Sequence, residues 1–470
     1  MEASRPLSSL GFGVTAASIL ALSPAYFLFS RTAVHDIYLT VSIAVALVLV
    51  FLLSRASAVS TRIQILSGGL IGLALGVGVL AKGLLSLGLP VLVAGLYLAV
   101  ADRSARRPFT GRFGLALLLG LVVVALPWHL AAWHAHGYAF IENYLMRSHV
   151  RRFTTELDDH AGPWFFYLLA YPALTFPWGI PAAAAWTEQH GSNPRLWLRR
   201  ARHEPLLLFC SIWIVVTVGL LSLASTKLPH YILSALPPTA ILAASYFWPS
   251  RQAPSAGAGL SRLLLLLTSG VLLLAALLLR WSPALLIPIS QKTPDFSLAL
   301  RAQLGGASML AGLSLLSAAG LWAAWSSQRP RVHLGLLWAA CILGLLLFQA
   351  PPLMQAYRHT IQDPRLALAE RALQERRTDE PLQVFGQAWY SIKILSHGRA
   401  EILSRGKAFG EAHQVAVARA CGRPGLLLGP IRSLETLIRS CGSGSATVLH
   451  QDRRARLILV RWQPFPALQI

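Results

Sequence analysis

The sequence is short of charged residues, and above all of acidic ones. Only 13% of its 470 residues are charged, while 55% are hydrophobic and the mean hydropathy is +0.55. Soluble domains carry about 25% charged residues, so the composition excludes an ordinary cytosolic enzyme as well as a disordered or collagen-like chain. Four cysteines in a chain of this length also exclude a small secreted domain held together by disulfides. The composition is typical of a membrane protein.

The charge is strongly positive, with 41 Lys and Arg against 19 Asp and Glu and a net charge of +22. Nucleic-acid binding would need basic residues interleaved with aromatic ones on a polar surface, and no stretch has that character. Cytoplasmic loops of membrane proteins collect Arg and Lys, which anionic lipids hold there. The charge therefore predicts membrane lipids as partners and no nucleic acid.

Long apolar runs fill the first three quarters of the chain. A helix needs about 20 apolar residues to cross the hydrocarbon core. With the N-terminus inside, most Lys and Arg of residues 1–354 fall in cytoplasmic loops. We therefore predict a polytopic α-helical membrane domain over residues 1–354, with about eleven transmembrane helices at 10–30, 36–54, 65–81, 84–101, 113–130, 164–185, 206–224, 231–248, 263–280, 304–326 and 333–352.

Residues 355–470 contain no run long enough to span a membrane, and we predict a separate C-terminal α/β domain there. An odd number of spans places it on the outer side. Cys421 and Cys441 both lie in this domain, and either a disulfide or two free thiols fits the sequence. Short apolar runs predict strands at Leu382–Phe385, Gly425–Leu428, Ala446–Leu449 and Leu457–Val460, with helices at Leu366–Arg377 and Ile431–Ile438.

Ionisable residues in so apolar a chain mark function more often than elsewhere, and the topology gathers the informative ones at the outer face. Asp36 follows the first predicted span. Its carboxylate could bind a metal or a sugar hydroxyl or act as a base, or it could be an N-cap of the next helix. Lys82 follows a glycine-rich run that lets helices approach closely. Its ammonium could bind a lipid phosphate or simply snorkel to the membrane surface.

Two further segments carry cations on the same side. Arg152 can grip a phosphate through two parallel N–H groups, and His149 shares its helical face. Lys227 and Tyr231 flank an outside turn, where they could hold an anion or act as interfacial anchors. Together these residues predict an outward-facing site for a polyprenyl or other lipid phosphate.

The order of these motifs resembles the ArnT-like branch of the dolichyl-phosphate-mannose–protein mannosyltransferase family, which are GT-C glycosyltransferases of bacterial inner membranes. The resemblance covers residues 1–250. It rests on Arg31…His35-Asp36, Leu-Ala-Lys82-Gly83, Pro127-Trp128, His149-Val-Arg-Arg152-Phe153, Gly162-Pro163-Trp164-Phe165, Phe176-Pro177-Trp178 and Ser225-Thr-Lys227-Leu-Pro-His-Tyr231.

The resemblance implies transfer of a sugar from an undecaprenyl phosphate donor, at the periplasmic face, to lipid A, another glycolipid or a protein. Matching positions imply that Lys82, His149, Arg152, Lys227 and Tyr231 bind the donor. Asp36 matches the family's second acidic position, which makes it a candidate catalytic base. No organic cofactor is implied. A divalent metal would take part of its ligands from the family's first outer loop.

The sequence departs from the family at its start. The family begins with a span, an outer loop bearing an Asp-Glu pair and a second span, whereas this sequence opens at what resembles the third span and has no Asp-Glu pair within residues 1–354. We expect these family elements to be absent from the given sequence. Two other functions therefore stay open, namely an inactive homologue that binds the lipid-linked sugar and a lipid-phosphate transporter or flippase.

Overall fold

The computed structural model describes residues 10–32, 34–142, 144–146, 162–190, 204–248, 258–287, 294–325, 331–377, 380–385, 396, 400–403, 421–441, 444–452 and 457–464. The chain forms two compact units. The first comprises residues 1–156, 160–275 and 311–346, and the second comprises 157–159, 276–310 and 347–470.

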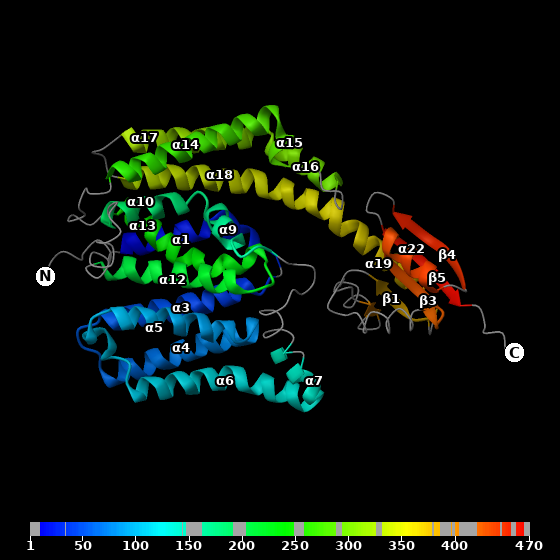
Figure 1. Cartoon of the computed structure of the whole chain (residues 1–470), viewed down its shortest axis with the longest axis horizontal. Coiled ribbons are helices and arrows are strands. Elements are labelled where there is room, and N and C mark those ends of the chain that lie inside the picture. The colour runs from blue at the N-terminus through cyan, green and yellow to red at the C-terminus, as the bar shows by residue number, and fades with distance from the viewer. Residues whose placement is uncertain are drawn as a thin grey trace. The chain divides into compact units, whose positions relative to one another are not determined.

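Helices dominate both units up to the C-terminal sheet (Figure 1). The helices up to the middle of the chain are α1 (Leu10–Ala21), α2 (Pro24–Phe29), α3 (Asp36–Arg55), α4 (Thr61–Lys82), α5 (Leu85–Val100), η2 (Arg103–Arg106), α6 (Gly111–His136), α7 (Tyr138–Ile141), α9 (Phe166–Thr175), α10 (Gly179–His190), α12 (Pro205–Leu223), η4 (Pro229–Ala235) and α13 (Leu236–Phe247). Those that follow are α14 (Ala258–Trp281), α15 (Pro283–Leu286), α16 (Pro294–Leu304), α17 (Ala307–Trp325), α18 (Arg331–Tyr357), η6 (Arg358–Gln362) and α19 (Asp363–Glu375).

Within the described part of the chain, six helices are long and apolar enough to cross a membrane, or seven if one bent pair counts as a single span. The protein is thus a multi-pass helical membrane protein. Each of the eleven predicted ranges contains helix, but the total of eleven spans remains a prediction. The predicted domain boundary at residue 354 falls inside α18 and also remains a prediction.

Three of the predicted spans are not single α-helices, and proline explains the break in two of them. The predicted span 10–30 divides before Pro24, where Ser23 is extended. The span 164–185 divides at Phe176, which is extended before Pro177. The span 231–248 begins as the 3-10 helix η4 and becomes the α-helix α13 just before Pro237 and Pro238. A residue before proline is driven out of the helical region, as Ser23 and Phe176 are, so the first two of these spans are interrupted.

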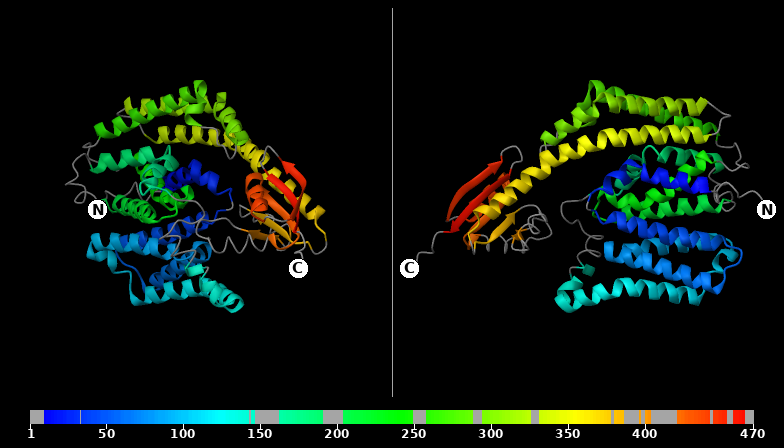
Figure 2. Two further views of the ribbon diagram at one scale, coloured as in Figure 1. Left: turned by 45° about the vertical axis from the view of Figure 1, so that its right-hand side comes forward. Right: turned by 180° about the vertical axis from the view of Figure 1, so that it is seen from behind.

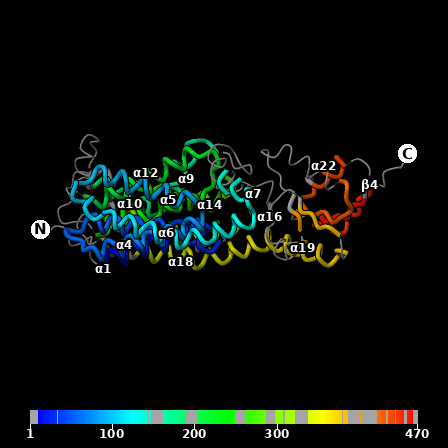
Figure 3. The backbone as a smooth tube through the Cα atoms, turned by 90° about the horizontal axis from the view of Figure 1, so that it is seen from below, coloured from blue at the N-terminus to red at the C-terminus, as the bar shows by residue number. Residues whose placement is uncertain are grey.

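Glycines fix how closely α4 and α6 pack. In Figures 2 and 3 these two helices follow each other along most of their length. A Cβ at Gly72 would overlap the carbonyl oxygen of Leu117, and one at Gly76 would lie 2.7 Å from the Cβ of Val124. The two backbones therefore approach each other in a way that only glycine permits, as the sequence predicted for this run.

The core of the first unit lies between α3, α5 and α12. Phe209 of α12 stacks edge-on against Tyr97 of α5, with ring centroids 5.0 Å apart, and both side chains are buried. A second cluster joins α9, α12 and η4 around Tyr167 and Ile232, which are both fully buried. These two clusters hold the start of α3 and the whole of η4 in fixed positions.

The C-terminal part of the second unit is an α/β domain, as predicted. Its five strands have the order β2-β1-β3-β5-β4. Strand β1 is parallel to β2 and β3, whereas β5 is antiparallel to β3 and β4. The elements are β1 (Leu382–Phe385), β2 (Ala400–Leu403), β3 (Gly425–Pro430), α22 (Ile431–Cys441), β4 (Gly444–Asp452) and β5 (Leu457–Pro464).

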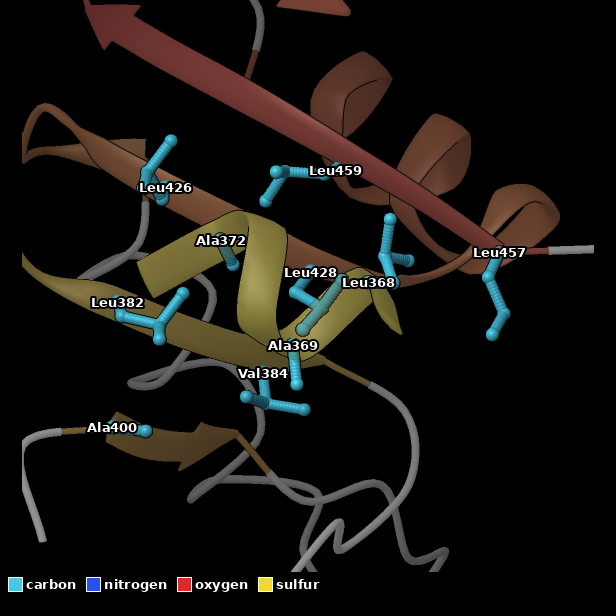
Figure 4. Close-up of a cluster of buried hydrophobic side chains, with 10 residues drawn as sticks. All are labelled: Leu368, Ala369, Ala372, Leu382, Val384, Ala400, Leu426, Leu428, Leu457 and Leu459. Atoms are coloured by element: carbon cyan, nitrogen blue, oxygen red, sulfur yellow. The ribbon is translucent and has the colours of Figure 1, made fainter. Parts of the chain in front are cut away.

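The two helices of this domain cover opposite faces of the sheet. Alternate residues of β3 divide between them: Leu426 and Leu428 pack with α19, and Leu427 packs with α22. Figure 4 shows Leu368, Ala369 and Ala372 of α19 lying over one face. The four predicted strands and both predicted helices are confirmed, and β2 is an additional strand. Cys421 and Cys441 form a disulfide, which decides between the two predicted states.

Candidate active site at the ends of α3 and α4

Asp36 is the first residue of α3, and its side chain is buried with 6% exposed. The alternative reading of Asp36 as an N-cap is wrong, because His35 occupies the cap position and makes no side-chain cap bond. The carboxylate lies in the first turn, where the helix dipole favours a negative charge. It is directed toward a cation from another helix instead of toward the α3 backbone.

That cation is Lys82, the last residue of α4. Gly83 ends the helix with a φ of 70°, a conformation that glycine adopts without strain. The Lys82 Nζ forms an ion pair with Asp36 Oδ1 and lies 3.6 Å from the centroid of the Tyr231 ring. The ammonium is thus held between a carboxylate and an aromatic face, which attracts cations through its quadrupole. Snorkelling alone does not describe this environment.

Tyr231 and His230 come from η4, which Pro229 begins. Tyr231 is buried, and the His230 Nε2 lies 3.6 Å from Asp36 Oδ2, the carboxylate oxygen opposite to the one that pairs with Lys82. The His230 ring also lies 5.6 Å from the Phe29 ring at the end of α2. His230 was not among the predicted site residues. The sequence does mark it as one of the ionisable residues that the predicted topology gathers at the outer face.

Lys227 has a different environment from the one predicted for an anion ligand. It is buried with 5% exposed. Its Nζ donates hydrogen bonds to the carbonyl oxygens of Leu221 at 3.2 Å and Ser222 at 2.7 Å, and to that of Ala224. The last carbonyls of a helix have no partner within the helix, so the ammonium caps the C-terminal end of α12. The predicted role in donor binding remains a prediction.

Tyr167 ties this cap to η4. Its hydroxyl donates to the carbonyl oxygen of Leu228 at 3.0 Å and accepts from the Leu228 amide at 3.1 Å. Its ring lies 5.6 Å from the Lys227 Nζ. Gly162 passes against the same lysine, because a Cβ there would meet the Lys227 Cγ at 2.7 Å. The segment that follows α12 is thereby fixed before η4 begins.

The structure brings together three predicted site residues: Asp36, Lys82 and Tyr231. His149 and Arg152 lie outside the described residues. Among the described residues, no group of three His, Cys, Asp or Glu side chains could hold a metal ion. The Lys82 ammonium can exchange the Asp36 carboxylate for a phosphate, because its N–H groups can donate to either anion.

The chain is similar to known proteins of one family over part of its length. Residues 3–136 match the family model of dolichyl-phosphate-mannose-protein mannosyltransferase. The undecaprenyl phosphate-alpha-4-amino-4-deoxy-L-arabinose arabinosyl transferase of Pseudomonas paraeruginosa is 37% identical over 202 residues, which cover 42% of this chain and 34% of that protein. The same-named enzyme of Pectobacterium carotovorum is 32% identical over 244 residues, covering 51% and 40%. The predicted resemblance to the ArnT-like branch is confirmed.

The fold agrees with that of a solved ArnT. The crystal structure of ArnT from Cupriavidus metallidurans bound to undecaprenyl phosphate superposes with a TM-score of 0.68 at 19% identity, over 96% of this chain and 79% of that chain. At this identity the likeness concerns the fold. The chain matches the first two curated relatives over about a third of their length. The substrates of ArnT-like enzymes are therefore assigned to this chain only as a proposal.

Proposed function

We propose that the protein transfers a sugar from an undecaprenyl or other polyprenyl phosphate donor to lipid A, another glycolipid or a protein. The main support for the proposal is the cluster of Asp36, Lys82 and Tyr231, which lies where the start of α3 meets the end of α4. A cation beneath an aromatic ring at the end of a spanning helix suits a phosphate at the membrane surface. The named relatives support undecaprenyl phosphate as the carrier.

The chemistry needs both a cation and a carboxylate at this place. The lipid phosphate is the leaving group, and Lys82, together with Arg152, would stabilise the charge that develops on it. When Lys82 turns to the phosphate, it releases Asp36 Oδ1, which could then accept the proton of the acceptor. The reaction would be an inverting displacement at the anomeric carbon of the sugar.

The proposed topology puts this site on the periplasmic side of the inner membrane. Eleven spans with a cytoplasmic N-terminus would place the ends of α3 and α4 that carry Asp36 and Lys82, and also the C-terminal domain, in the periplasm. The disulfide between Cys421 and Cys441 supports an oxidising compartment for that domain.

A reconstituted transfer assay tests the function. The purified full chain in proteoliposomes receives undecaprenyl phosphate-linked 4-amino-4-deoxy-L-arabinose and radiolabelled lipid A, and the modified lipid A is measured. We expect wild-type transfer, and in Lys82→Met a loss of about 100-fold or more, as for removal of a group that stabilises transition-state charge.

Arg112→Met is the matched control. Arg112 is an exposed cation in the first turn of α6, where its guanidinium donates a hydrogen bond to the Thr61 hydroxyl at 3.4 Å. We expect this variant to keep its activity. Near-normal transfer by Lys82→Met would remove Lys82 from the site. Binding of the donor without any transfer by the wild type would favour a binding protein instead.

A further inference from the structure

Release of Lys82 creates an electrostatic problem for Asp36. The carboxylate is buried, with 6% of its side chain exposed, and its Oδ1 is paired with the Lys82 ammonium. A carboxylate buried without a cation is strongly disfavoured. Any movement of Lys82 toward a donor phosphate therefore requires a second source of positive charge beside Asp36.

His230 stands where such a charge is needed. Its Nε2 lies 3.6 Å from Oδ2, on the side of the carboxylate that Lys82 leaves open. This distance exceeds that of a good neutral hydrogen bond but falls within the range of an ion pair. The His230 side chain is 19% exposed, so water can deliver a proton to the ring. The ring is held in place between Phe29 and Tyr231.

We propose that His230 is the reserve counter-ion of Asp36, and that it takes up one proton from water when a donor phosphate draws Lys82 away. An O–H bond of a solvent hydronium ion breaks and an N–H bond forms on the His230 ring, so the buried charge of the cluster stays balanced. His230 is a positioning residue in this scheme, since it acts on the substrate only through Asp36 and Lys82. The proposal rests on the proposed function and adds a proton to its first step.

The proposed proton uptake near neutral pH is assigned to His230 and not to the tyrosines and lysines around it. The elements that pack against η4 bring Tyr26 from α2, Asp36 from α3, Tyr167 from α9 and Lys227 from the end of α12, and Lys82 reaches in from α4. Tyrosine and lysine ordinarily titrate near pH 10, far above the range of the proposed proton uptake. Histidine alone titrates in the physiological range.

The direction of the pH dependence of donor affinity follows from which state, donor-free or donor-bound, holds the proton on His230. Below about pH 6.5 an ordinary histidine is already protonated without the donor, so affinity should not depend on pH there. At higher pH the donor must draw a proton from water to bind. Affinity should then fall by roughly tenfold for each pH unit until the donor-bound state also loses its proton.

Binding of undecaprenyl methyl phosphate to the full chain in lipid nanodiscs tests the proposal. This phosphodiester keeps one negative charge between pH 5.5 and 8.5, so its own titration does not contribute. For the wild type we expect the dissociation constant to rise at least tenfold from pH 6 to pH 8. His230→Gln should remove this slope and bind weakly throughout, and His230→Lys, which stays positively charged, should also give a flat profile.

His134→Gln is the matched control, because His134 is an exposed histidine in the last turn of α6. It should keep the wild-type slope. A wild-type profile without slope, or a slope that survives in both His230 variants, would overturn the role of His230 while leaving the proposed function intact. Failure of the wild type to bind the phosphodiester at any pH would refute the proposed function and the role of His230 together.

Discussion

At the scale of single residues, the two lysines of the outer end use their charge differently. Lys82 faces a carboxylate and an aromatic ring, which a phosphate can replace or share. Lys227 donates to three main-chain carbonyl groups at the end of α12 and is more deeply buried. Lys82 is therefore the better placed of the two to exchange partners, and Lys227 is better placed to hold the turn before η4.

Removal of one member of the Asp36–Lys82 pair should destabilise the protein more than removal of both. Lys82→Met leaves the buried carboxylate without its main cation, and we expect a loss of roughly 1–3 kcal/mol, below the value for fully buried pairs because Lys82 is partly exposed. The double variant Asp36→Asn/Lys82→Met should recover part of that loss. Thermal unfolding of both variants in detergent measures the difference.

The opposite order of stability would contradict this view of the pair. If the double variant unfolded at a lower temperature than Lys82→Met, the Asp36 carboxylate would not need Lys82 as its counter-ion. Asp36→Asn alone serves as the reference, since it removes the carboxylate charge while keeping a side chain of nearly the same shape.

The sequence predicted that Asp36 and Lys82 belong to the site, but it did not predict the contact between them. Hydropathy placed Asp36 and Lys82 at the ends of two spans, and the alternation of spans put both on one side. It could not predict that they pair, because 46 residues separate them and the pairing depends on how α3 and α4 pack. The C-terminal cap that Lys227 forms on α12 could not be predicted either, because it depends on main-chain carbonyl groups, which no residue pattern identifies.

At the scale of helices, the contact between α4 and α6 depends on individual glycines. Gly72→Ala would force its Cβ into the backbone of Leu117 and Leu121, and we expect a loss of about 1–3 kcal/mol from the separation of the two helices. Gly69→Ala is the matched control, because nothing lies within 4 Å of a Cβ at that position. Alanine there should be neutral or slightly stabilising, since it favours helix over glycine.

Thermal unfolding of the two glycine variants in one detergent checks this prediction. Equal melting temperatures would mean that α6 can move away from α4 without cost. A lower melting temperature for Gly69→Ala than for Gly72→Ala would contradict the packing directly.

Long apolar helices were predictable because one property, hydropathy, determines them. The predicted range 36–54 coincides with α3 to within one residue, and 206–224 coincides equally well with α12. The break at Pro24 was less predictable, since proline is tolerated inside other helices of this chain, such as Pro90 in α5 and Pro127 in α6. Strand β2 was missed because four residues with one charge among them give little periodicity.

At the scale of the whole molecule, the C-terminal domain is closed by a disulfide as well as by its core. Cys421 precedes β3 and Cys441 ends α22, so the bond links both ends of this strand and helix. Loss of the bond in Cys421→Ser/Cys441→Ser should lower the stability of this domain by about 3 kcal/mol, because the bond restricts the unfolded chain.

Thiol alkylation before and after reduction of the native protein measures the bond. We expect Cys421 and Cys441 to react only after reduction, with the free Cys341 as an internal reference within the same chain. Alkylation of Cys421 and Cys441 in the unreduced, denatured protein would show that the domain does not reside in an oxidising compartment.

The central claim is that the lipid phosphate binds where α3, α4 and η4 meet. The most direct test is photolabelling of the full chain in membranes with an undecaprenyl phosphate analogue that carries a diazirine beside the phosphate, followed by mass spectrometry of the labelled peptides. We predict labels around Lys82 and in Leu228–Ala235, which unlabelled undecaprenyl phosphate prevents. Labels confined to the C-terminal domain, or labels that the competitor does not reduce, would contradict the claim.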